Sequence, residues 1–169
     1  MIARRSSRDV DPRGFPLCSD MRMSAYDRGN ADSFSLEPHG RRINKPWGYE
    51  ILLSPPDAPY TSKLIHVHAG KRLSLQVHDM KVETQTLVAG RGLLVLEGPD
   101  GELHDIDMQP GMGYHVAVGQ RHRLCAPGDQ DATVFETSTP ENGVTLRLED
   151  DYARPDETEQ VRQAERAAL

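Results

Sequence analysis

The regular punctuation of this chain by turn residues limits its fold more than any other feature of the sequence. Gly, Pro and Asp cluster at residues 90–92, 99–101, 109–111 and 127–129. Between the clusters lie short runs in which apolar and polar residues alternate, the pattern of a strand with one buried face. About ten such runs follow one another at the spacing of roughly 8–12 residues that is typical of all-β sandwiches and closed barrels. The sequence therefore predicts an all-β fold rather than a βαβ architecture.

The turns on either side define the expected strands. These are residues 51–53, 62–68, 73–78, 83–88, 93–96, 102–108, 113–118, 121–125, 132–138 and 144–148. A helical pattern emerges only after residue 155, where Pro155 is followed by Asp156 and Glu157, residues that favour a helix N-terminus. Val161 and Ala164 give this segment only a thin apolar stripe. We expect a short, partly solvated helix at the C-terminal end.

Charge divides the chain into segments. Residues 1–45 hold nine Lys and Arg against six Asp and Glu, whereas the remainder is strongly acidic. Apolar residues near the N-terminus are isolated, too few to offset the entropy cost of ordering the segment. We expect residues 1–43 to form an irregular basic arm, 44–154 the folded domain, and 155–169 a helical tail. Alternatives are an arm that adds a strand or packs on a dimer partner, and a true start at Met21 or Met23.

Several classes of protein are disfavoured by composition. The net charge of −6 argues against non-specific nucleic-acid binding. The sequence contains no run of about 18 apolar residues, so we expect no membrane span. The N-terminus lacks the apolar region of a secretory signal. The two cysteines, Cys18 and Cys125, lie too far apart in the sequence to suggest a disulfide framework. A cytoplasmic location is the expectation.

Four polar residues form a candidate metal site. On the expected strand 73–78, Gln76 and His78 point to one face, opposite the apolar side chains. Glu83 follows after a turn, and His122 lies on a later strand that a small barrel folds back beside the first. Mixed nitrogen and oxygen ligands suit one divalent ion, with zinc first and iron, manganese, cobalt or nickel as alternatives. Cys125 takes no part and is expected to be a small core residue.

The spacing of these residues resembles the cupins. Gly70, Gln76, His78, Glu83 and Gly90 match the spacing of the first cupin motif, with Gln76 where a His usually stands. Residues 119–122 resemble the end of the second motif, although residue 118 is Val where cupins usually have Pro. The resemblance implies a single cupin barrel, that is, a double-stranded β-helix or jelly roll, and a homodimer.

Within the cupins, the chain is most similar to the type II cupin domain of phosphomannose isomerases. Three segments carry this likeness: Lys-Pro-Trp-Gly-Tyr-Glu at 45–50, Leu-Ser-Leu-Gln-Val-His at 73–78, and the stretch 147–154. Lys81 stands where that domain has Arg, and Thr84-Gln85 where it has His-Trp. The resemblance implies metal binding by Gln76, His78, Glu83 and His122, and a metal-dependent sugar-phosphate isomerase or epimerase, with interconversion of mannose 6-phosphate and fructose 6-phosphate as the leading reaction.

Such an isomerase needs groups that move a proton and groups that hold the substrate. The candidate catalytic residues are Lys81, Arg154 and Glu83, although Glu83 is better suited to be a ligand. Candidate substrate-binding residues are Lys63, Arg147 and Tyr152, and the expected partner is a sugar or sugar phosphate.

Two alternative functions stay open: a mononuclear metal dioxygenase that uses the same ligands, and a non-catalytic sugar-binding cupin. An apolar pocket would favour the dioxygenase, whereas inward cations would favour a phosphorylated sugar. His66 and His68 form another His-x-His pair, on the face opposite Ile65 and Val67. Exposed or interface histidines are the simpler interpretation of this pair.

Overall fold

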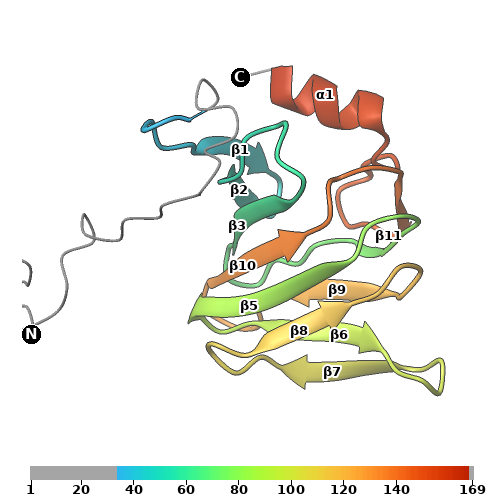
Figure 1. The fold of residues 1–169 in the computed structure, drawn as a ribbon. Helices are drawn as coiled ribbons and strands as arrows, with labels where there is room; N and C mark the ends of the chain where they lie inside the picture. The colour runs from blue at the N-terminus through green and yellow to red at the C-terminus, as the bar shows by residue number, and fades with distance from the viewer. Residues whose placement is uncertain (1–33, 168–169) are drawn as a thin grey trace, which may run out of the picture. The chain divides into compact units, whose positions relative to one another are not determined.

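The computed structural model describes residues 34–167, and these form an all-β unit with one short helix (Figure 1). Residues 1–33 of the predicted arm lie outside the described residues. The elements in chain order are β1 (Arg41–Lys45), β2 (Gly48–Leu52), β3 (Thr61–Val67), β4 (Leu75–His78), β5 (Glu83–Gly90), β6 (Leu93–Glu97), β7 (Leu103–Asp107), β8 (Gly113–Val116), β9 (His122–Cys125), β10 (Ala132–Ser138), β11 (Thr145–Glu149) and α1 (Glu159–Ala167).

The strands form two antiparallel sheets. One has the order β1-β2-β3-β10-β5-β8, and the other has the order β11-β4-β9-β6-β7. Strands distant in sequence are therefore neighbours: β10 pairs with both β3 and β5, and β9 pairs with both β4 and β6. This crossing topology carries the segment after β8 back beside β4, as the expected metal site requires.

Alternation along the strands builds the core between the sheets. Ile65 and Val67 of β3, Leu87 of β5, Leu94 of β6 and Leu124 of β9 are all buried. Each such side chain contributes about 2 kcal/mol by leaving water. Trp47, the single tryptophan, is also fully buried within this cluster.

One inward row of the larger sheet is polar instead of apolar. Lys63 of β3 pairs in register with Glu136 of β10, and Glu136 pairs with Gln85 of β5. All three side chains are buried, and each follows the inward phase of its strand. The row therefore places charge inside the unit, next to the core.

The observed elements differ from the predicted ones mainly at their ends. β10 coincides with the predicted strand 132–138, whereas β1 was not predicted. Four of the five residues of β1 are polar, so its sequence shows no alternation; only Ile43 is buried, and pairing with β2 holds the strand in place. Residues 41–43, assigned to the arm from sequence, are therefore part of the sheet.

The C-terminal helix begins four residues later than Pro155 suggests. Glu157 pairs with Thr145 in an isolated bridge, which keeps the chain extended at that point. The hydroxyl of Thr158 accepts a hydrogen bond from the amide of Val161, so Thr158 caps the helix. The buried side chain of α1 is Arg162, not an apolar residue. No helix in residues 34–167 is long and apolar enough to cross a membrane.

Candidate metal centre and its pocket

His78, Glu83 and His122 converge in the interior. The Nε2 atom of His78 lies 3.2 Å from Oε2 of Glu83, and Nε2 of His122 lies 3.3 Å from Oε1 of the same carboxylate. One potential ligand atom from each residue lies within 4.8 Å of the others, and all three side chains are buried. The structure therefore brings together the ligand set that the sequence predicts from two distant segments.

Strand ends and one short connection fix this geometry. His78 ends β4 and Glu83 begins β5, so a connection of four residues separates the two ligands. The amide of Gly119 donates to the carbonyl of His78 at 2.8 Å, which ties the segment before β9 to the end of β4. His122 begins β9 opposite Gln76 of β4.

Hydrogen bonds at the far side of each ring leave the Nε2 atoms available. Nδ1–H of His122 donates to the carbonyl of Gln120 at 3.0 Å, and Nδ1 of His78 lies 3.0 Å from the Thr145 hydroxyl. Such bonds orient metal-binding imidazoles and select their tautomer. Among the described residues, Nε2 of His78 and Oε2 of Glu83 are buried without a hydrogen bond, and Oε2 forms an ion pair with Lys81. These polar atoms and the two-His, one-Glu donor set fit a divalent cation.

Gln76 also reaches the site. Its Nε2 atom lies 3.3 Å from Nε2 of His122, and its Oε1 accepts a hydrogen bond from the Ser74 hydroxyl at 2.8 Å. An amide nitrogen is not a metal ligand, so coordination by Gln76 requires the amide to turn over and present its oxygen. After that rotation the nitrogen would donate to Ser74, and the pair would remain hydrogen-bonded.

Lys81 lies directly beside the cluster. Its Nζ atom lies 2.6 Å from Oε2 of Glu83 and 3.2 Å from Oε1 of Glu136. Burial lowers the pKa of Lys81, but these two carboxylates outweigh burial and raise the pKa above its usual value. Lys81 is thus an ammonium ion at neutral pH, which suits a proton donor or electrostatic partner and not a free base.

The same contacts set the charge of the candidate ligands. Burial raises the pKa of Glu83, but Lys81 and the two imidazoles outweigh it and hold the pKa well below the usual range. Burial, with a further contribution from Lys81, lowers the pKa of His78. An ionised carboxylate and a neutral imidazole are the forms that bind a metal.

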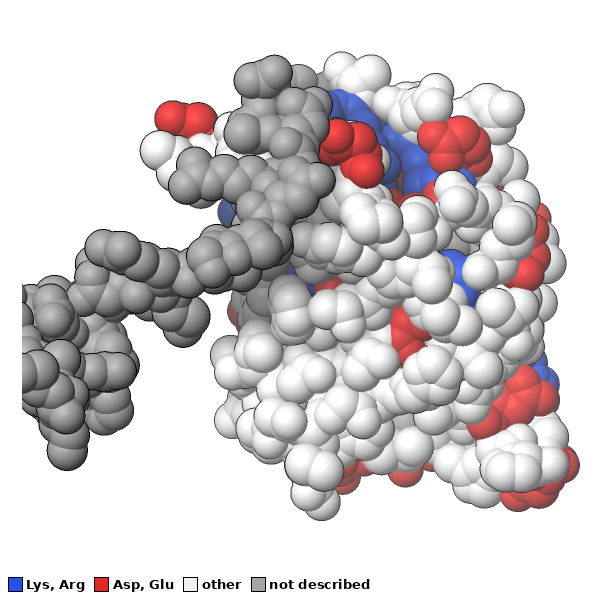
Figure 2. Space-filling model, viewed as in Figure 1, with Lys and Arg blue, Asp and Glu red and all other residues white. Residues whose placement is uncertain are grey.

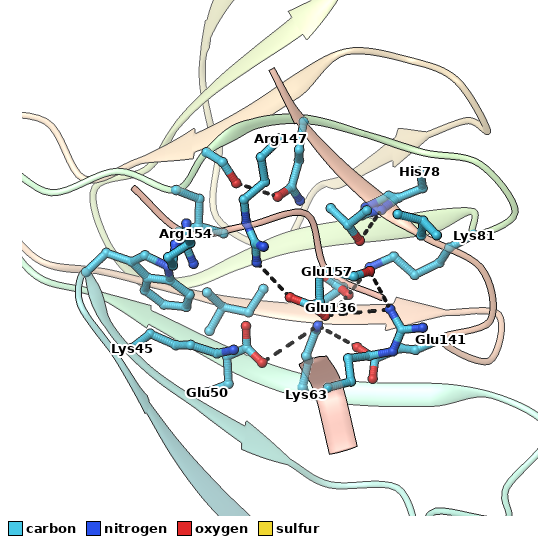
Figure 3. A pocket seen from close by; sticks show the side chains of 18 of the residues that line it. Lys45, Glu50, Lys63, His78, Lys81, Glu136, Glu141, Arg147, Arg154 and Glu157 are labelled. Atoms are coloured by element: carbon cyan, nitrogen blue, oxygen red, sulfur yellow. Dashed lines mark hydrogen bonds and ion pairs between the residues drawn. The ribbon is translucent and has the colours of Figure 1, made fainter. Parts of the chain in front are cut away.

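A polar pocket adjoins the cluster (Figure 3). It encloses a cavity of about 40 Å³, and His78, Gln76 and Lys81 belong to its wall. Among the described residues that line it, six are cations and four are carboxylates. The cations are Lys45, Lys63, Lys81, Arg147, Arg154 and Arg162, and the carboxylates are Glu50, Glu136, Glu141 and Glu157.

Two of the three candidate substrate-binding residues, Lys63 and Arg147, line the pocket, and Tyr152 does not. Lys63 lies 2.9 Å from Glu141 and 3.4 Å from Glu136, and Arg147 pairs with Glu157 at 2.8 Å. Arg154, a candidate catalytic residue, also lines the pocket and pairs with Asp150 at 2.5 Å. Tyr152 is not among the pocket residues: it packs against the core cluster, and its hydroxyl donates to the carbonyl of Arg72.

Sequence reasoning missed Glu136 and Gln85. Glu136 is buried between Lys63 and Lys81, and Gln85 donates to Oε1 of Glu83 at 2.8 Å. A signal for both exists in the sequence. In 132–138, Glu136 occupies the same phase as Ala132 and Val134, and Gln85 occupies the phase of Leu87. A charged or amide side chain in the apolar phase of a strand marks an inward polar group.

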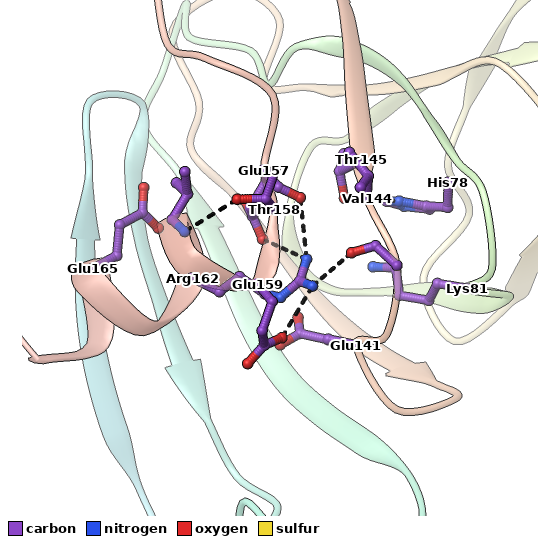
Figure 4. A network of polar contacts seen from close by, with 12 residues as sticks. His78, Lys81, Glu141, Val144, Thr145, Glu157, Thr158, Glu159, Arg162 and Glu165 are labelled. Carbon is purple, nitrogen blue, oxygen red and sulfur yellow. Dashed lines mark hydrogen bonds and ion pairs between the residues drawn. The ribbon is translucent and has the colours of Figure 1, made fainter.

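Helix α1 contributes the charged side chain of Arg162 to the pocket wall. The guanidinium of Arg162 donates to the carbonyl of Gly143 at 2.7 Å and lies 3.2 Å from Glu159 (Figure 4). Further ion pairs join α1 to the pocket wall, from Glu165 to Lys45 and from Arg166 to Glu141. Figure 2 shows basic and acidic atoms side by side at the upper part of one face, above a broad area that is mostly white with scattered charged residues.

Solved structures of oxalate decarboxylase are similar to this chain. One, concerned with substrate binding and a switch of reaction specificity, is 19% identical with a TM-score of 0.55, over 64% of this chain and 30% of its own. Another, concerned with the Mn(II) centres of the Bacillus subtilis enzyme, is 19% identical with the same TM-score, over 63% of this chain and 29% of its own. The chain thus spans about 30% of the length of these enzymes. No family model and no curated protein matches it.

These likenesses show that the chain has the cupin fold, as its motifs predict. At 19% identity they establish the fold alone. The case for a metal rests on the geometry of His78, Glu83 and His122 within this chain.

Proposed function

We propose that this cupin is a metal-dependent isomerase or epimerase of a sugar or sugar phosphate, with interconversion of mannose 6-phosphate and fructose 6-phosphate as the leading reaction. One observation carries the proposal: the buried His78, Glu83 and His122 cluster adjoins a pocket whose wall is charged instead of apolar. The sequence likeness to phosphomannose isomerases over three separate segments supports the same reaction.

The pocket wall suits a polyhydroxylated anion. Carboxylates and cations both line it, so that hydroxyl groups of a substrate meet both acceptors and donors of hydrogen bonds. Six cations and four carboxylates line the pocket among the described residues, and Lys45, Arg154 and Arg162 also pair with carboxylates outside that set, so an anionic ligand would take over some of these pairs. Arg147 and Arg154 can meet a phosphoryl group with paired donors.

A divalent cation held by His78, Glu83, His122 and the turned amide of Gln76 would supply a Lewis acid for the carbonyl and hydroxyl oxygens of the substrate. Zinc is the leading ion, and manganese, iron, cobalt and nickel suit the same donors. Gln85 holds the carboxylate of Glu83 in place through its hydrogen bond. Glu83 serves as a ligand and does not move the proton.

Lys81 and Glu136 are placed to handle the proton between C1 and C2. Both are buried, and their charged atoms lie 3.2 Å apart. The carboxylate of Glu136 takes the proton from one carbon and returns it to the next, while the Lys81 ammonium donates a hydrogen bond to the substrate oxygen on which negative charge develops. Lys63 lies 3.4 Å from Glu136 on its other side.

A mononuclear metal dioxygenase is the second candidate. Two histidines and one carboxylate are the donor set of the facial triad in non-haem iron oxygenases. The charged pocket wall makes this function the less favoured of the two, because an apolar substrate would have to displace buried ion pairs.

The test is a set of turnover assays on the metal-loaded protein. Mannose 6-phosphate, glucose 6-phosphate and the free sugars are each incubated with protein loaded with zinc, manganese or iron, and the ketose is measured. We expect ketose from at least one sugar phosphate and none from the Glu83→Gln variant. Oxygen uptake with no ketose would establish the dioxygenase, and saturable sugar binding without turnover would establish a binding protein.

A further inference from the structure

We propose that His66, His68 and Asp131 form a second divalent metal site, on the outer face of the six-stranded sheet. Within residues 34–167, this cluster and the inner centre are the two groups of His, Cys, Asp and Glu whose potential ligand atoms lie within 4.8 Å of one another. The proposal does not depend on the function proposed above.

The three donors have the spacing that a metal requires. Nε2 of His66 lies 3.2 Å from Oδ2 of Asp131, and Nδ1 of His68 lies 3.9 Å from the same oxygen. Bonds of about 2.0–2.2 Å to a tetrahedral zinc place the ligand atoms roughly 3.4 Å apart. Small movements of the exposed His68 ring are therefore enough to complete three ligands, with water as the fourth.

Neighbouring groups hold two of the donors in place. Nδ1 of His66 lies 2.9 Å from the Thr133 hydroxyl, and the ring of His66 stacks on Tyr49 with centroids 4.6 Å apart. These contacts leave Nε2 of His66 directed at Asp131. Oδ1 of Asp131 accepts the amide of Ala69 at 2.7 Å, so Oδ2 faces the two imidazoles. Hydrogen bonds of this kind orient the ligands of established metal sites.

The topology brings the donors together and separates them from the inner centre. His66 and His68 lie at the end of β3, and Asp131 directly precedes β10, with Val67 opposite Ala132 in the pairing. Successive residues of a strand point to opposite faces. Because Ile65 and Val67 are buried in the core, His66 and His68 point away from it, and two ions could bind without sharing a ligand.

The ligand types select the ion. Two imidazoles and one carboxylate suit zinc, nickel, cobalt and copper, whereas magnesium and calcium prefer oxygen ligands. A bound ion would link the end of β3 to the start of β10.

The experiment counts zinc ions by equilibrium dialysis of tag-free, chelator-treated protein. We expect two equivalents for the wild type and one for each of His68→Ala and Asp131→Asn. Both changes are at exposed residues, which keeps the risk of misfolding low, and circular dichroism checks the fold. His104→Ala is the matched control, because His104 is an exposed histidine that faces a single carboxylate, Asp100, at 3.0 Å; it should retain two equivalents.

Three outcomes separate this proposal from the inner centre. If His68→Ala and Asp131→Asn bind as much zinc as the wild type, the outer site does not exist. If the wild type binds one ion that His68→Ala loses and Glu83→Gln retains, the outer site stands and the inner centre fails. Equal loss in His104→Ala and His68→Ala would overturn the proposal, since any surface histidine would then have the same effect.

Discussion

The ammonium nitrogen of Lys81 lies 2.6 Å from Oε2 of Glu83, the carboxylate that also faces His78 and His122. The positive charge beside the cluster keeps Glu83 ionised, and it also repels a metal ion bound to the same carboxylate. Lys81 therefore affects both the ionisation of Glu83 and the affinity of the cluster for a metal ion. Glu136 offers the Lys81 ammonium a second partner when a metal is bound to Glu83.

Removing the charge of Lys81 should strengthen metal binding and weaken catalysis. In Lys81→Met we expect roughly tenfold tighter binding of zinc, about 1.4 kcal/mol, because the like charge is gone. Turnover should fall by about 10² or more, because the donor to the substrate oxygen is also lost. Competition with a chromophoric chelator measures the affinity. Lys81→Arg, which keeps the charge, should bind zinc within about threefold of the wild type; weaker binding by Lys81→Met would contradict the repulsion.

Glu136→Gln tests the proposed base. The amide is close in shape to the carboxylate but cannot accept the proton, so kcat should fall by roughly 10²–10⁴ while KM changes little. Metal content should stay the same, because Glu136 contacts Lys81 and Lys63 and none of the candidate ligands. The exposed Glu102→Gln is the control and should keep full activity. Normal turnover by Glu136→Gln would assign the base elsewhere.

Arg154→Gln tests whether the pocket recognises phosphate. Arg154 lines the pocket, and glutamine can still donate to its partner, Asp150. We expect KM for a phosphorylated sugar to rise about tenfold with kcat nearly unchanged, and the constants for the free sugar to stay the same. Arg91→Gln removes an exposed cation that pairs with Asp107 and is the control. Equal effects on both sugars would exclude a role in phosphate binding.

The carboxylate of Glu141 should make the fold sensitive to acid. Burial raises its pKa, but Lys63, Lys81 and Arg166 outweigh burial and hold the pKa well below the usual value of 4.5. Its contribution to stability is therefore present above pH 4.5 and is lost as the pH falls below that value. Glu141→Gln should cost about 1–3 kcal/mol at pH 7 and less at pH 3, because the contribution is lost gradually between pH 4.5 and the much lower folded pKa. Urea unfolding at the two pH values gives both numbers.

The contribution of Glu50 to stability depends on pH in the opposite direction to that of Glu141. Burial raises its pKa, and Lys63 only partly offsets the shift. The stability that Glu50 contributes is thus greatest below pH 4.5 and decreases as the pH rises through its folded pKa. Glu50→Gln should leave the fold equally or more stable at pH 7, in contrast to Glu141→Gln. Similar losses in both variants at pH 7 would contradict the assigned shifts.

The sequence predicts the ligands because their spacing carries the information. Gln76 and His78 share a strand face, and Glu83 follows a short turn. His122 was predicted from its place on a later strand that a small barrel folds back, and the motif likeness implied the same residue; the pairing of β9 with β4 places it beside Gln76. The fold class follows from alternation and turns, which are local properties of the chain.

The partners in the pocket were harder to predict because they depend on strand register. Nothing local shows that Glu136 lies opposite Lys63, since 73 residues separate them in sequence and only the β3–β10 pairing joins them. The docking of α1 through Arg162 was also missed. An amphipathic pattern predicts that apolar side chains are the buried ones, whereas here a buried arginine donates hydrogen bonds to the carbonyls of Gly143 and Glu157. Asp131 escaped notice beside His66 and His68 for the same reason as Glu136.

The central claim is that His78, Glu83 and His122 hold one divalent cation inside the barrel. The most direct test is the zinc content of His68→Ala, in which the outer site is removed, compared with His68→Ala combined with Glu83→Gln. We predict one tightly bound equivalent in the first protein and none in the second, with both folded by circular dichroism. Equal zinc content in the two proteins, or no zinc in either, would contradict the account.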